Sequence, residues 1–318
     1  MRILILRGGA LGDFLVTLPA LRLLREHWPD ARIELVGNAR AGELGVLGGY
    51  LDAVHSQDQA RWSALFSPQT PPRALTAWLA GFDLIVDYWP DPGGLRARGL
   101  PVRPGQTHLS APAWPTMAPA ARHFCEPLRA LGLSTDDFAG RLAVRRLGAP
   151  AEGFPAWRRR STAQREDEPL GLIAIHPGSG SPRKNWPRAR WLELVERLDR
   201  PTLLVLGEAE HEWLSAVRRP DPRMHLASNL PLPALAAVLA RCRLFLGHDS
   251  GVSHLAAAVG TPCLLLFGPT DPAMWAPPGD HVRVLRRGNT LDAISVDEVR
   301  TLASRADLIR AAKVRRTI

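Results

Sequence analysis

The stretch MRILILRGGALGDFLVTLPALRLLREHWPDARIELVG, residues 1–37, begins with a short apolar run that leads into a glycine-rich turn. The apolar run at residues 3–6 predicts a buried β-strand, and the pattern at residues 14–26 predicts an amphipathic helix. A second apolar run follows at residues 32–36. A strand, a turn, a helix and a second strand in this order predict a βαβ unit of a parallel sheet.

Short apolar runs and helical patterns alternate along most of the 318 residues. In the first half, further strands are predicted at residues 53–55, 84–86 and 142–144, and further helices at 73–79 and 120–131. In the second half, strands are predicted at residues 172–175, 202–206, 244–246, 263–267 and 282–285. The helices predicted there are residues 188–198, 210–217, 233–240, 253–259 and 296–313. The fold class is therefore α/β, with two doubly wound parallel sheets.

A polar segment rich in proline and glycine separates the two alternating halves, which is typical of a linker. The predicted domains are residues 1–147 and 170–318, with the linker at residues 148–169. Ligands of such folds bind at the carboxyl ends of the strands. Two such edges that face each other would form a cleft, which suits a reaction with two substrates.

The composition narrows the class of protein. The formal net charge is +9, and the hydrophobic content of 46% is that of a globular protein. The basic excess favours anionic partners, but no basic run is interleaved with aromatic residues, so nucleic acid is not an expected partner. No apolar stretch approaches the ~20 residues of a transmembrane helix, and the three cysteines are widely spaced. A cytoplasmic protein is predicted, with peripheral contact to an anionic membrane left open.

The turn GGALGD, residues 8–13, departs from two common phosphate-binding patterns. It lacks the G-x-G-x-x-G spacing of a dinucleotide fingerprint and the lysine of a P-loop. It carries a carboxylate, Asp13, where an anion would sit. Two interpretations stay open: Asp13 caps the following helix, or Asp13 is a general base that accepts the proton of an attacking hydroxyl group.

Three further turns follow predicted strands in the second half. The loop HPGSGSPRKNWP, residues 176–187, combines glycines and serines with the charge of Lys184, which suits phosphate. The acidic segment at residues 208–210 stands at a strand end, where a ribose diol is commonly held. The segment GHDSGVSH, residues 247–254, joins Asp249, which suits sugar hydroxyls, to a helix start that suits anions.

Each of these turns also has a purely structural interpretation, as a flexible loop, a solvated helix start or a capping residue. For His254, the structural interpretation is a half-buried histidine near the start of the helix. Asp-Ser-Gly beside a histidine suggests a serine hydrolase, but no G-x-S-x-G elbow is present, and the members of a triad come from separate elements.

Taken together, these segments resemble glycosyltransferase family 9, the bacterial lipopolysaccharide heptosyltransferases. The N-terminal signature is R-x-x-x-L-G-D-x-x-x-T-x-P-A-L at residues 7–21, and the phosphate loop is H-P-G-S…K-x-W-P at residues 176–187. The C-terminal signature is G-x-D-S-G-x-x-H-L-A-A at residues 247–257, followed by G-T-P…F-G-P-T at residues 260–270.

The resemblance implies a GT-B fold: two Rossmann-like domains that face a cleft, with the last helix packed back on the first domain. It implies an inverting glycosyltransferase that moves a heptose from ADP-heptose to a hydroxyl group of an acidic acceptor in the lipopolysaccharide inner core. No cofactor and no essential metal are expected. The alternatives are a transferase or epimerase that uses another nucleotide-sugar, a transferase with a protein or secondary-metabolite acceptor, and a catalytically silent protein of the same fold.

The resemblance also assigns roles to individual residues. Asp13 is the expected catalytic base. The residues expected at the donor are Ser179, Gly180 and Lys184 for the diphosphate, Glu210 for the ribose, Leu230 for the adenine, Asp249 for the donor sugar, and Ser250, Gly251 and His254 beside it. The candidates for contact with an acidic acceptor are Arg61, Arg96, Arg98 and His123.

Overall fold

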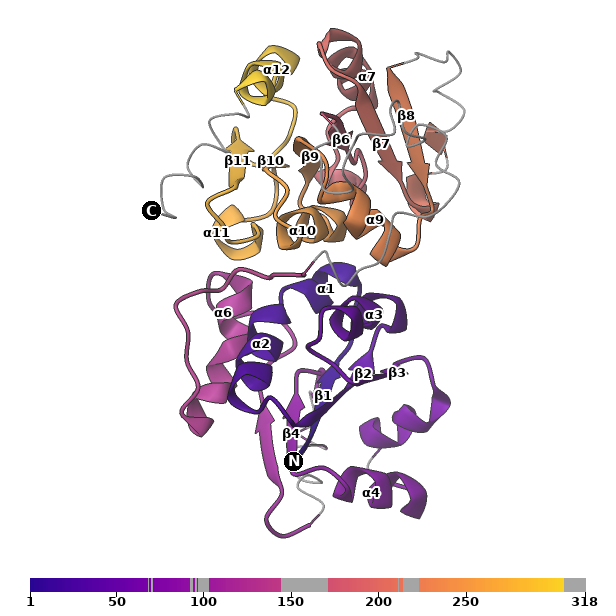
Figure 1. Ribbon diagram of the computed structural model, residues 1–318, viewed down its shortest axis with the longest axis vertical. Coiled ribbons are helices and arrows are strands. Elements are labelled where there is room, and N and C mark those ends of the chain that lie inside the picture. Colours follow the sequence, from indigo (N-terminus) through magenta and orange to yellow (C-terminus); the bar gives the residue numbers. More distant parts are fainter. Residues whose placement is uncertain are drawn as a thin grey trace, which may run out of the picture. The chain divides into compact units, whose positions relative to one another are not determined.

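The computed structural model describes residues 1–67, 69, 71–91, 94, 96, 103–143, 171–210, 212–213 and 223–305. The chain forms two compact units, Met1–Gly140 and Arg141–Ile318, each built around one β-sheet (Figure 1). Every strand pair within the described residues is parallel. The prediction of two doubly wound parallel sheets is confirmed. The predicted linker at residues 148–169 and Arg98 lie outside the described residues.

The sheet of the first unit has the strand order β3-β2-β1-β4-β5. Its strands are β1 (Arg2–Arg7), β2 (Arg32–Gly37), β3 (Ala53–Ser56), β4 (Leu84–Asp87) and β5 (Thr107–Ser110). Its helices are α1 (Leu11–Leu15), α2 (Leu18–His27), α3 (Ala39–Leu47), α4 (Arg73–Ala80) and α6 (Ala120–Cys125), with 3-10 helices η1 (Ala60–Phe66) and η2 (Glu126–Leu131). The order of strands reverses beside β1, so the topological switch point lies between β1 and β4.

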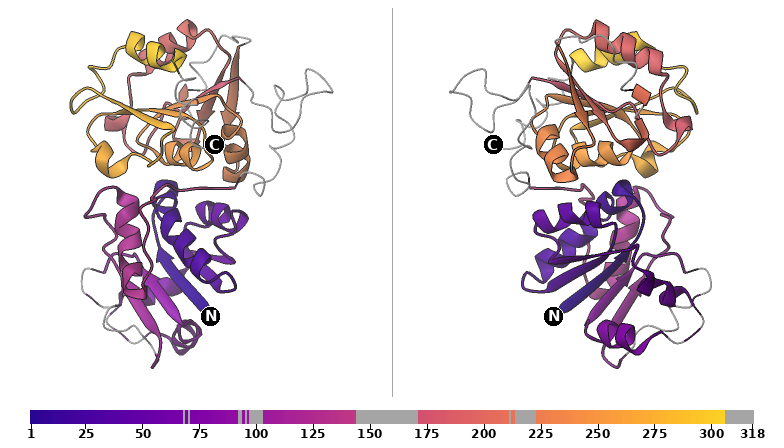
Figure 2. Two further views of the ribbon diagram at one scale, coloured as in Figure 1. Left: turned by 60° about the vertical axis from the view of Figure 1, so that its left-hand side comes forward. Right: turned by 90° about the vertical axis from the view of Figure 1, so that its right-hand side faces the viewer.

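Helices cover both faces of this first sheet (Figures 1 and 2). The central strand β1 is apolar and buried from Ile3 to Leu6, as expected for a parallel strand covered on both sides. On one face, its residues Leu4 and Leu6 join an apolar cluster with Trp62 of η1 and Leu79 of α4. The helices α2 and α6 pack against each other.

The helix predicted at residues 14–26 is two helices, α1 and α2. Pro19 lies in the first turn of α2 and has no N–H to donate to the carbonyl group of Leu15. The N–H of Thr17 instead bonds to the Phe14 carbonyl oxygen at 3.0 Å. The break leaves α1 as a short helix of its own, and this helix carries Asp13.

The sheet of the second unit has the strand order β11-β10-β9-β6-β7-β8. Its strands are β6 (Ile173–Ile175), β7 (Thr202–Leu206), β8 (Met224–Ser228), β9 (Leu244–His248), β10 (Cys263–Phe267) and β11 (Val282–Arg286). Its helices are α7 (Arg188–Arg197), α9 (Leu232–Leu239), α10 (Gly251–Ala258), α11 (Pro272–Trp275) and α12 (Val296–Ser304), with 3-10 helices η5 (Pro182–Lys184) and η6 (Glu208–Glu210). The switch point lies between β6 and β9.

The helices of the second unit also form two layers. α7 and α12 lie side by side on one face of the sheet, and α9 and α10 lie on the other (Figures 1 and 2). Trp191 and Leu194 of α7 belong to the apolar cluster of this unit, together with Trp186 just before that helix. The three cysteines, Cys125, Cys242 and Cys263, are buried thiols without disulfide partners. Cys242 and Cys263 are therefore small core residues.

The strand predictions need correction in both directions. The edge strands β5 (THLS) and β8 (MHLAS) were not predicted, because their sequences mix polar with apolar residues and are only partly buried. A strand was predicted at residues 142–144, but residues 141–143 are not a strand, and residue 144 lies outside the described part. The N–H of Leu142 bonds to the Ala258 carbonyl oxygen at the end of α10, at 2.8 Å, and not to a neighbouring strand. Of the helix predicted at residues 296–313, the described part is α12.

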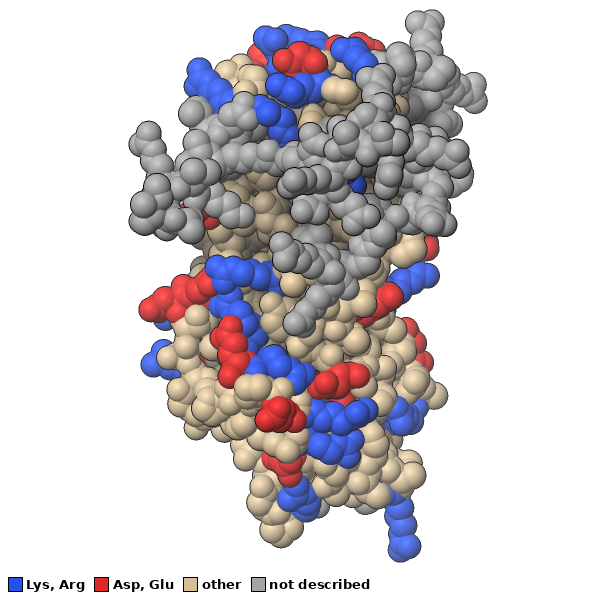
Figure 3. All heavy atoms as spheres, viewed as in Figure 1, with Lys and Arg blue, Asp and Glu red and all other residues tan. Residues whose placement is uncertain are grey.

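Basic and acidic side chains are interspersed over the face of the first unit seen in Figure 3. Ion pairs of the first unit include Arg22 with Asp137 at 3.2 Å and Arg25 with Asp52 at 2.7 Å. Some of the basic side chains of this unit are therefore paired with acidic ones. No helix within the described residues is long and apolar enough to span a membrane.

Candidate functional site

Three of the predicted donor segments meet at the carboxyl edge of the second sheet. The loop at residues 176–187 follows β6, η6 follows β7, and Asp249 follows β9. Since β6 lies between β7 and β9 in the sheet, these segments are neighbours in space although they are distant in sequence. The switch point between β6 and β9 is where ligands of doubly wound folds bind.

Lys184 and Asp249 form an ion pair across this switch point. Lys184 Nζ donates to Asp249 Oδ2 at 2.7 Å, and the two residues are 65 positions apart in the chain. The Asp249 side chain is 9% exposed and that of Lys184 is 30% exposed. An ammonium group has three N–H donors, so Lys184 keeps donors for an anionic ligand while Asp249 orients it.

Glu210 is buried and joins the β7 turn to the β6 loop. Its Oε2 accepts a hydrogen bond from the Gly207 N–H at 2.8 Å. Its other oxygen, Oε1, lies so close to Gly178 that a methyl group on Gly178 would be 1.9 Å from it. The glycine therefore permits the carboxylate to lie directly over the β6 loop, where a carboxylate can accept hydrogen bonds from a diol.

The helix α10 begins directly behind Asp249. Ser250 is the N-cap residue, and its Oγ accepts a hydrogen bond from the Ser253 N–H at 3.3 Å. Gly251 is the first helical residue, and the Ser253 hydroxyl donates to the His248 carbonyl oxygen. The structural interpretation of Ser250 as a cap is confirmed, and the ligand contact expected at Ser250 stays a prediction. His254 is buried in the first turn of α10.

The remaining residues of the phosphate loop differ in their surroundings. The Ser179 hydroxyl makes hydrogen bonds within the loop, to Ser181 O at 2.8 Å and to Asn185 Oδ1 at 2.6 Å. Ser179 therefore shapes the loop in this structure. Gly180 has open space around it, since a methyl group on this glycine would have no atom within 4 Å. Leu230 is half-buried just after β8, at the same carboxyl edge of the sheet.

Two buried histidines, His176 at the start of this loop and His248 at the end of β9, were not predicted as site residues. His248 Nε2 accepts a hydrogen bond from the Trp186 N–H at 2.8 Å, and His176 Nδ1 lies 2.9 Å from the Val205 carbonyl oxygen. Burial lowers the pKa of His176, and burial together with His176 lowers the pKa of His248 to about 3. Both rings are therefore neutral near pH 7, and His248 acts as a hydrogen-bond acceptor that fixes the end of the phosphate loop.

In the first unit, Asp13 is the third residue of α1, and the N-cap is Ala10. Its Oδ2 accepts a hydrogen bond from the Ala10 N–H at 2.9 Å, so the carboxylate does cap the helix, although from the N3 position rather than the predicted N-cap. Gly9 has a φ angle of +104°, and a methyl group on it would lie 2.4 Å from Asp13 Oδ2. A glycine is required at position 9 because other residues rarely adopt this φ angle and because a side chain there would clash with the Asp13 carboxylate.

Arg7 is a buried partner of Asp13 that sequence reasoning placed only in a signature. Its Nη2 donates to Asp13 Oδ1 at 3.1 Å, and its Nε lies 3.1 Å from the Asp13 carbonyl oxygen. The guanidinium also packs over the Phe124 ring, 4.2 Å from the ring centroid. The Asp13 side chain stays 37% exposed. The carboxylate is thus held in one orientation while it remains accessible to a substrate.

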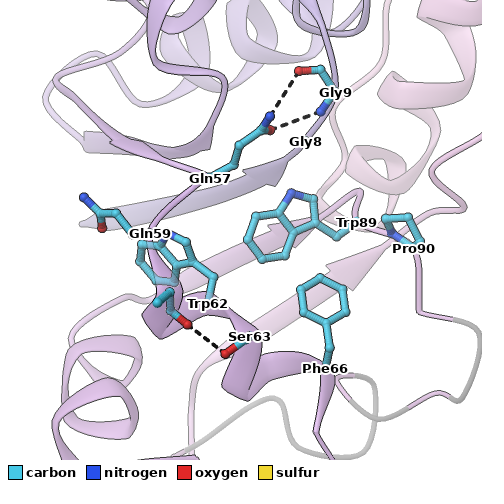
Figure 4. Close-up of a pocket in the computed structure, with 10 residues that line it drawn as sticks. Gly8, Gly9, Gln57, Gln59, Trp62, Ser63, Phe66, Trp89 and Pro90 are labelled. Carbon is cyan, nitrogen blue, oxygen red and sulfur yellow. Dashed lines mark hydrogen bonds between the residues drawn. The ribbon is translucent and has the colours of Figure 1, made fainter.

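A pocket of about 450 Å³ lies at the carboxyl ends of β1, β3 and β4 in the first unit (Figure 4). We call it the switch-point pocket. It is lined by Gly8, Gly9, Gln57, Gln59, Ala60, Trp62, Ser63, Phe66, Trp89 and Pro90. The Gln57 amide clamps Gly9, because Oε1 accepts from the Gly9 N–H at 3.1 Å and Nε2 donates to its carbonyl oxygen at 3.4 Å. No sequence motif marked this pocket.

The candidate acceptor residues have other partners. His123 is buried, with Nε2 2.7 Å from Pro112 O and Nδ1 3.4 Å from the Thr116 N–H, so both nitrogens serve the loop at residues 112–116. Arg96 is buried in an ion pair with Asp87 at 2.7 Å. Both side chains hold neighbouring segments of the first unit in place, and their contact with an acceptor stays a prediction.

Arg61 is exposed, and its guanidinium packs over the Trp62 ring at 4.1 Å. The charge of Arg61 therefore lies at the surface of η1. Within the described residues, no group of three His, Cys, Asp or Glu side chains is placed to hold a metal ion.

The model of glycosyltransferase family 9 (heptosyltransferase) matches residues 149–303, which include all the donor segments described above. Over residues 149–303 the chain matches glycosyltransferase family 9, and the chain is a family 9-like glycosyltransferase.

Among curated relatives of this chain, lipopolysaccharide heptosyltransferase 1 of Pseudomonas aeruginosa is 27% identical over 290 residues, which cover 86% of this chain and 80% of the relative. Lipopolysaccharide heptosyltransferase 2 of Escherichia coli K12 is 31% identical over 125 residues, 36% of each chain.

Solved structures share the fold of this chain. The family 9 glycosyltransferase of Veillonella parvula aligns with a TM-score of 0.77 at 20% identity, covering 96% of this chain and 97% of that one. The E. coli heptosyltransferase WaaC with ADP aligns with a TM-score of 0.71 at 22% identity, covering 96% of this chain and 100% of that one. The fold is therefore GT-B, as predicted.

Proposed function

We propose that this protein transfers a heptose from ADP-heptose to a hydroxyl group of an acidic glycolipid, the lipopolysaccharide inner core, with inversion at the anomeric carbon. The observation that carries the proposal is the Lys184–Asp249 ion pair at the switch point of the second sheet, with the Glu210 carboxylate over Gly178 beside it. Relatives named as lipopolysaccharide heptosyltransferases support the choice of substrates.

The donor is assigned to the second unit. Lys184 holds the diphosphate, and the N-terminal end of α10 at Ser250 and Gly251 supplies further positive partial charge. Glu210 accepts hydrogen bonds from the ribose hydroxyls, Asp249 accepts them from the sugar, and Leu230 packs against the adenine. Ser179 contributes through the shape of the loop.

The reaction needs one proton acceptor and one stabilised leaving group. The acceptor hydroxyl oxygen attacks the anomeric carbon as the bond from that carbon to the phosphate oxygen breaks. Asp13 takes the hydroxyl proton, and Lys184 stabilises the negative charge that gathers on the departing ADP. These residues accomplish the step without a metal ion. Because the acceptor is a glycolipid, we place the enzyme in the cytoplasm at the surface of the inner membrane.

The test is an incubation of the full chain with ADP-heptose and an inner-core acceptor that lacks the heptose. The expected result is release of ADP and a mass increase of one heptose on the acceptor, with the opposite anomeric configuration to that of the donor by NMR. A product formed only from a different nucleotide-sugar would contradict the heptose assignment. Conversion of the nucleotide-sugar to an isomer without transfer would support an epimerase instead.

A further inference from the structure

The switch-point pocket of the first unit has a distinctive chemical character. Its walls are the aromatic rings of Trp62, Phe66 and Trp89, and its polar groups are the neutral side chains of Gln57, Gln59 and Ser63 (Figure 4). None of its described lining residues carries a charge. A pocket of this composition suits an uncharged ligand that presents an apolar face and several hydroxyl groups.

The aromatic walls are held in place from below. Asp87 at the end of β4 accepts hydrogen bonds from the Trp89 N–H at 2.9 Å and from Arg96 Nε at 2.7 Å. Arg96 Nη2 also donates to the Trp89 carbonyl oxygen at 2.9 Å, and its guanidinium lies 4.8 Å from the Phe66 ring centroid. The charge of Arg96 is neutralised by Asp87, so this pair fixes the walls without making the pocket cationic.

The two outer walls form one platform. The Phe66 and Trp89 rings are stacked, with centroids 5.4 Å apart and planes 25° apart. Phe66 is 46% exposed, whereas Trp89 is 6% exposed. Gly8 admits the Trp89 indole, because a methyl group on Gly8 would lie 3.1 Å from Trp89 Nε1. The exposed part of the platform is therefore mainly the Phe66 ring.

The pocket adjoins the candidate base through a shared residue. Gly9 lines the pocket and also lies against the Asp13 carboxylate, as the 2.4 Å approach of a methyl group at Gly9 to Asp13 Oδ2 shows. The amide of Gln57 fixes Gly9 from the pocket side. A ligand in this pocket therefore lies on the same turn that carries the base.

We propose that the switch-point pocket binds an uncharged sugar ring of the acceptor, stacked on Phe66, with its hydroxyl groups at Gln57, Gln59 and Ser63. The C–H groups on one face of a pyranose carry partial positive charge and match the negative face of an aromatic ring. A carboxylate in the same place would lose hydration and would find no cationic partner among the described lining residues. The inference rests on the proposed function, since the ring is that of its acceptor, and it assigns the acidic groups of the glycolipid to positions outside the described lining.

The experiment compares two probes with the full chain in the absence of donor. Methyl α-D-mannopyranoside is the neutral probe, and the methyl glycoside of 3-deoxy-D-manno-octulosonic acid is the acidic one. Saturation-transfer NMR detects weak binding of either. We expect binding of the neutral probe, with its ring C–H protons nearest the protein, and weaker binding of the acidic probe.

Variants locate the binding. Phe66→Ala is expected to weaken binding of the neutral probe roughly tenfold, which corresponds to about 1.4 kcal/mol, because the aromatic surface under the sugar ring is lost. Phe66→Trp keeps a ring and is expected to retain binding. Trp114→Ala is the matched control, since Trp114 is an exposed aromatic residue of the same unit outside the described lining of the pocket. Stronger binding of the acidic probe, or unchanged binding in Phe66→Ala, would overturn the proposal.

ADP binding measured on the same samples keeps the two proposals separate. Wild-type protein that binds the neutral probe but not ADP would count against the proposed function and leave the sugar-binding pocket standing. Protein that binds ADP and transfers heptose, but fails the neutral-probe test, would overturn the inference about the pocket alone.

Discussion

The Glu210 carboxylate lies directly over the Cα atom of Gly178, so that a methyl group on this glycine would be 1.9 Å from Glu210 Oε1. This contact joins the turns after β6 and β7 at the carboxyl edge of the second sheet. It depends on the absence of one side chain, and it positions the group that we assign to the ribose.

Gly178→Ala is expected to weaken ADP binding roughly tenfold to hundredfold, because Glu210 must leave its position and its charged hydrogen bonds to the ligand are lost. Gly180→Ala is the matched control in the same loop, where no atom lies within 4 Å of the added methyl group. Isothermal titration calorimetry with ADP measures both. Equal affinities in the two variants would show that the contact between Gly178 and Glu210 does not shape the nucleotide site.

Lys184→Met is expected to weaken ADP binding by roughly one to two orders of magnitude, since a charge-assisted bond to phosphate is removed and the buried Asp249 loses its partner. Arg183→Met removes a neighbouring exposed charge and is expected to change the affinity little. The measurement is again calorimetry with ADP, repeated with adenosine. A similar loss of affinity for adenosine in Lys184→Met would contradict the placement of Lys184 on the diphosphate.

The stability of the first unit is expected to depend on Glu34 at low pH. Burial opposes ionisation of this carboxyl group, but hydrogen bonds from Arg2, His55 and Arg32 outweigh it and lower its pKa to about 2 from 4.5. A depressed pKa stabilises the folded state above the unfolded value, and this contribution is lost as the pH falls from 4.5 towards 2. Urea unfolding of wild type and Glu34→Gln over this range tests it: the free energy of unfolding should fall less steeply in the variant. If the free energy of unfolding fell equally steeply with falling pH in both proteins, the assignment of the lowered pKa to Glu34 would be contradicted.

The central strands were predictable because each is a short, continuous apolar run. β7 and β10 have the predicted bounds, residues 202–206 and 263–267. The edge strands β5 and β8 were missed because an edge strand needs less apolar sequence. The helix α3 was also not predicted, because Gly42 and Gly45 are more typical of a loop than of a helix. In the structure these glycines give Val54 and Leu51 room to pack, with added methyl groups only 2.8 Å and 2.7 Å from those side chains.

The candidate donor site was largely predictable, because its residues follow successive strands of one sheet and stand in short motifs. The partners that hold those residues were not. Arg7 contacts Asp13 only because α1 turns back over the end of β1. His248 supports Trp186 from 62 positions away. The residues that line the switch-point pocket follow three separate strands, so no local sequence pattern predicts the pocket.

The central claim is that this protein transfers heptose with Asp13 as the base. The most direct measurement is the rate of acceptor-dependent ADP release from ADP-heptose by Asp13→Asn, beside the exposed control Asp30→Asn and with ADP affinity measured on each protein. We predict a loss in kcat on the order of 10²–10⁴ for Asp13→Asn, with ADP affinity unchanged and the control active. Wild-type turnover in Asp13→Asn would contradict the account.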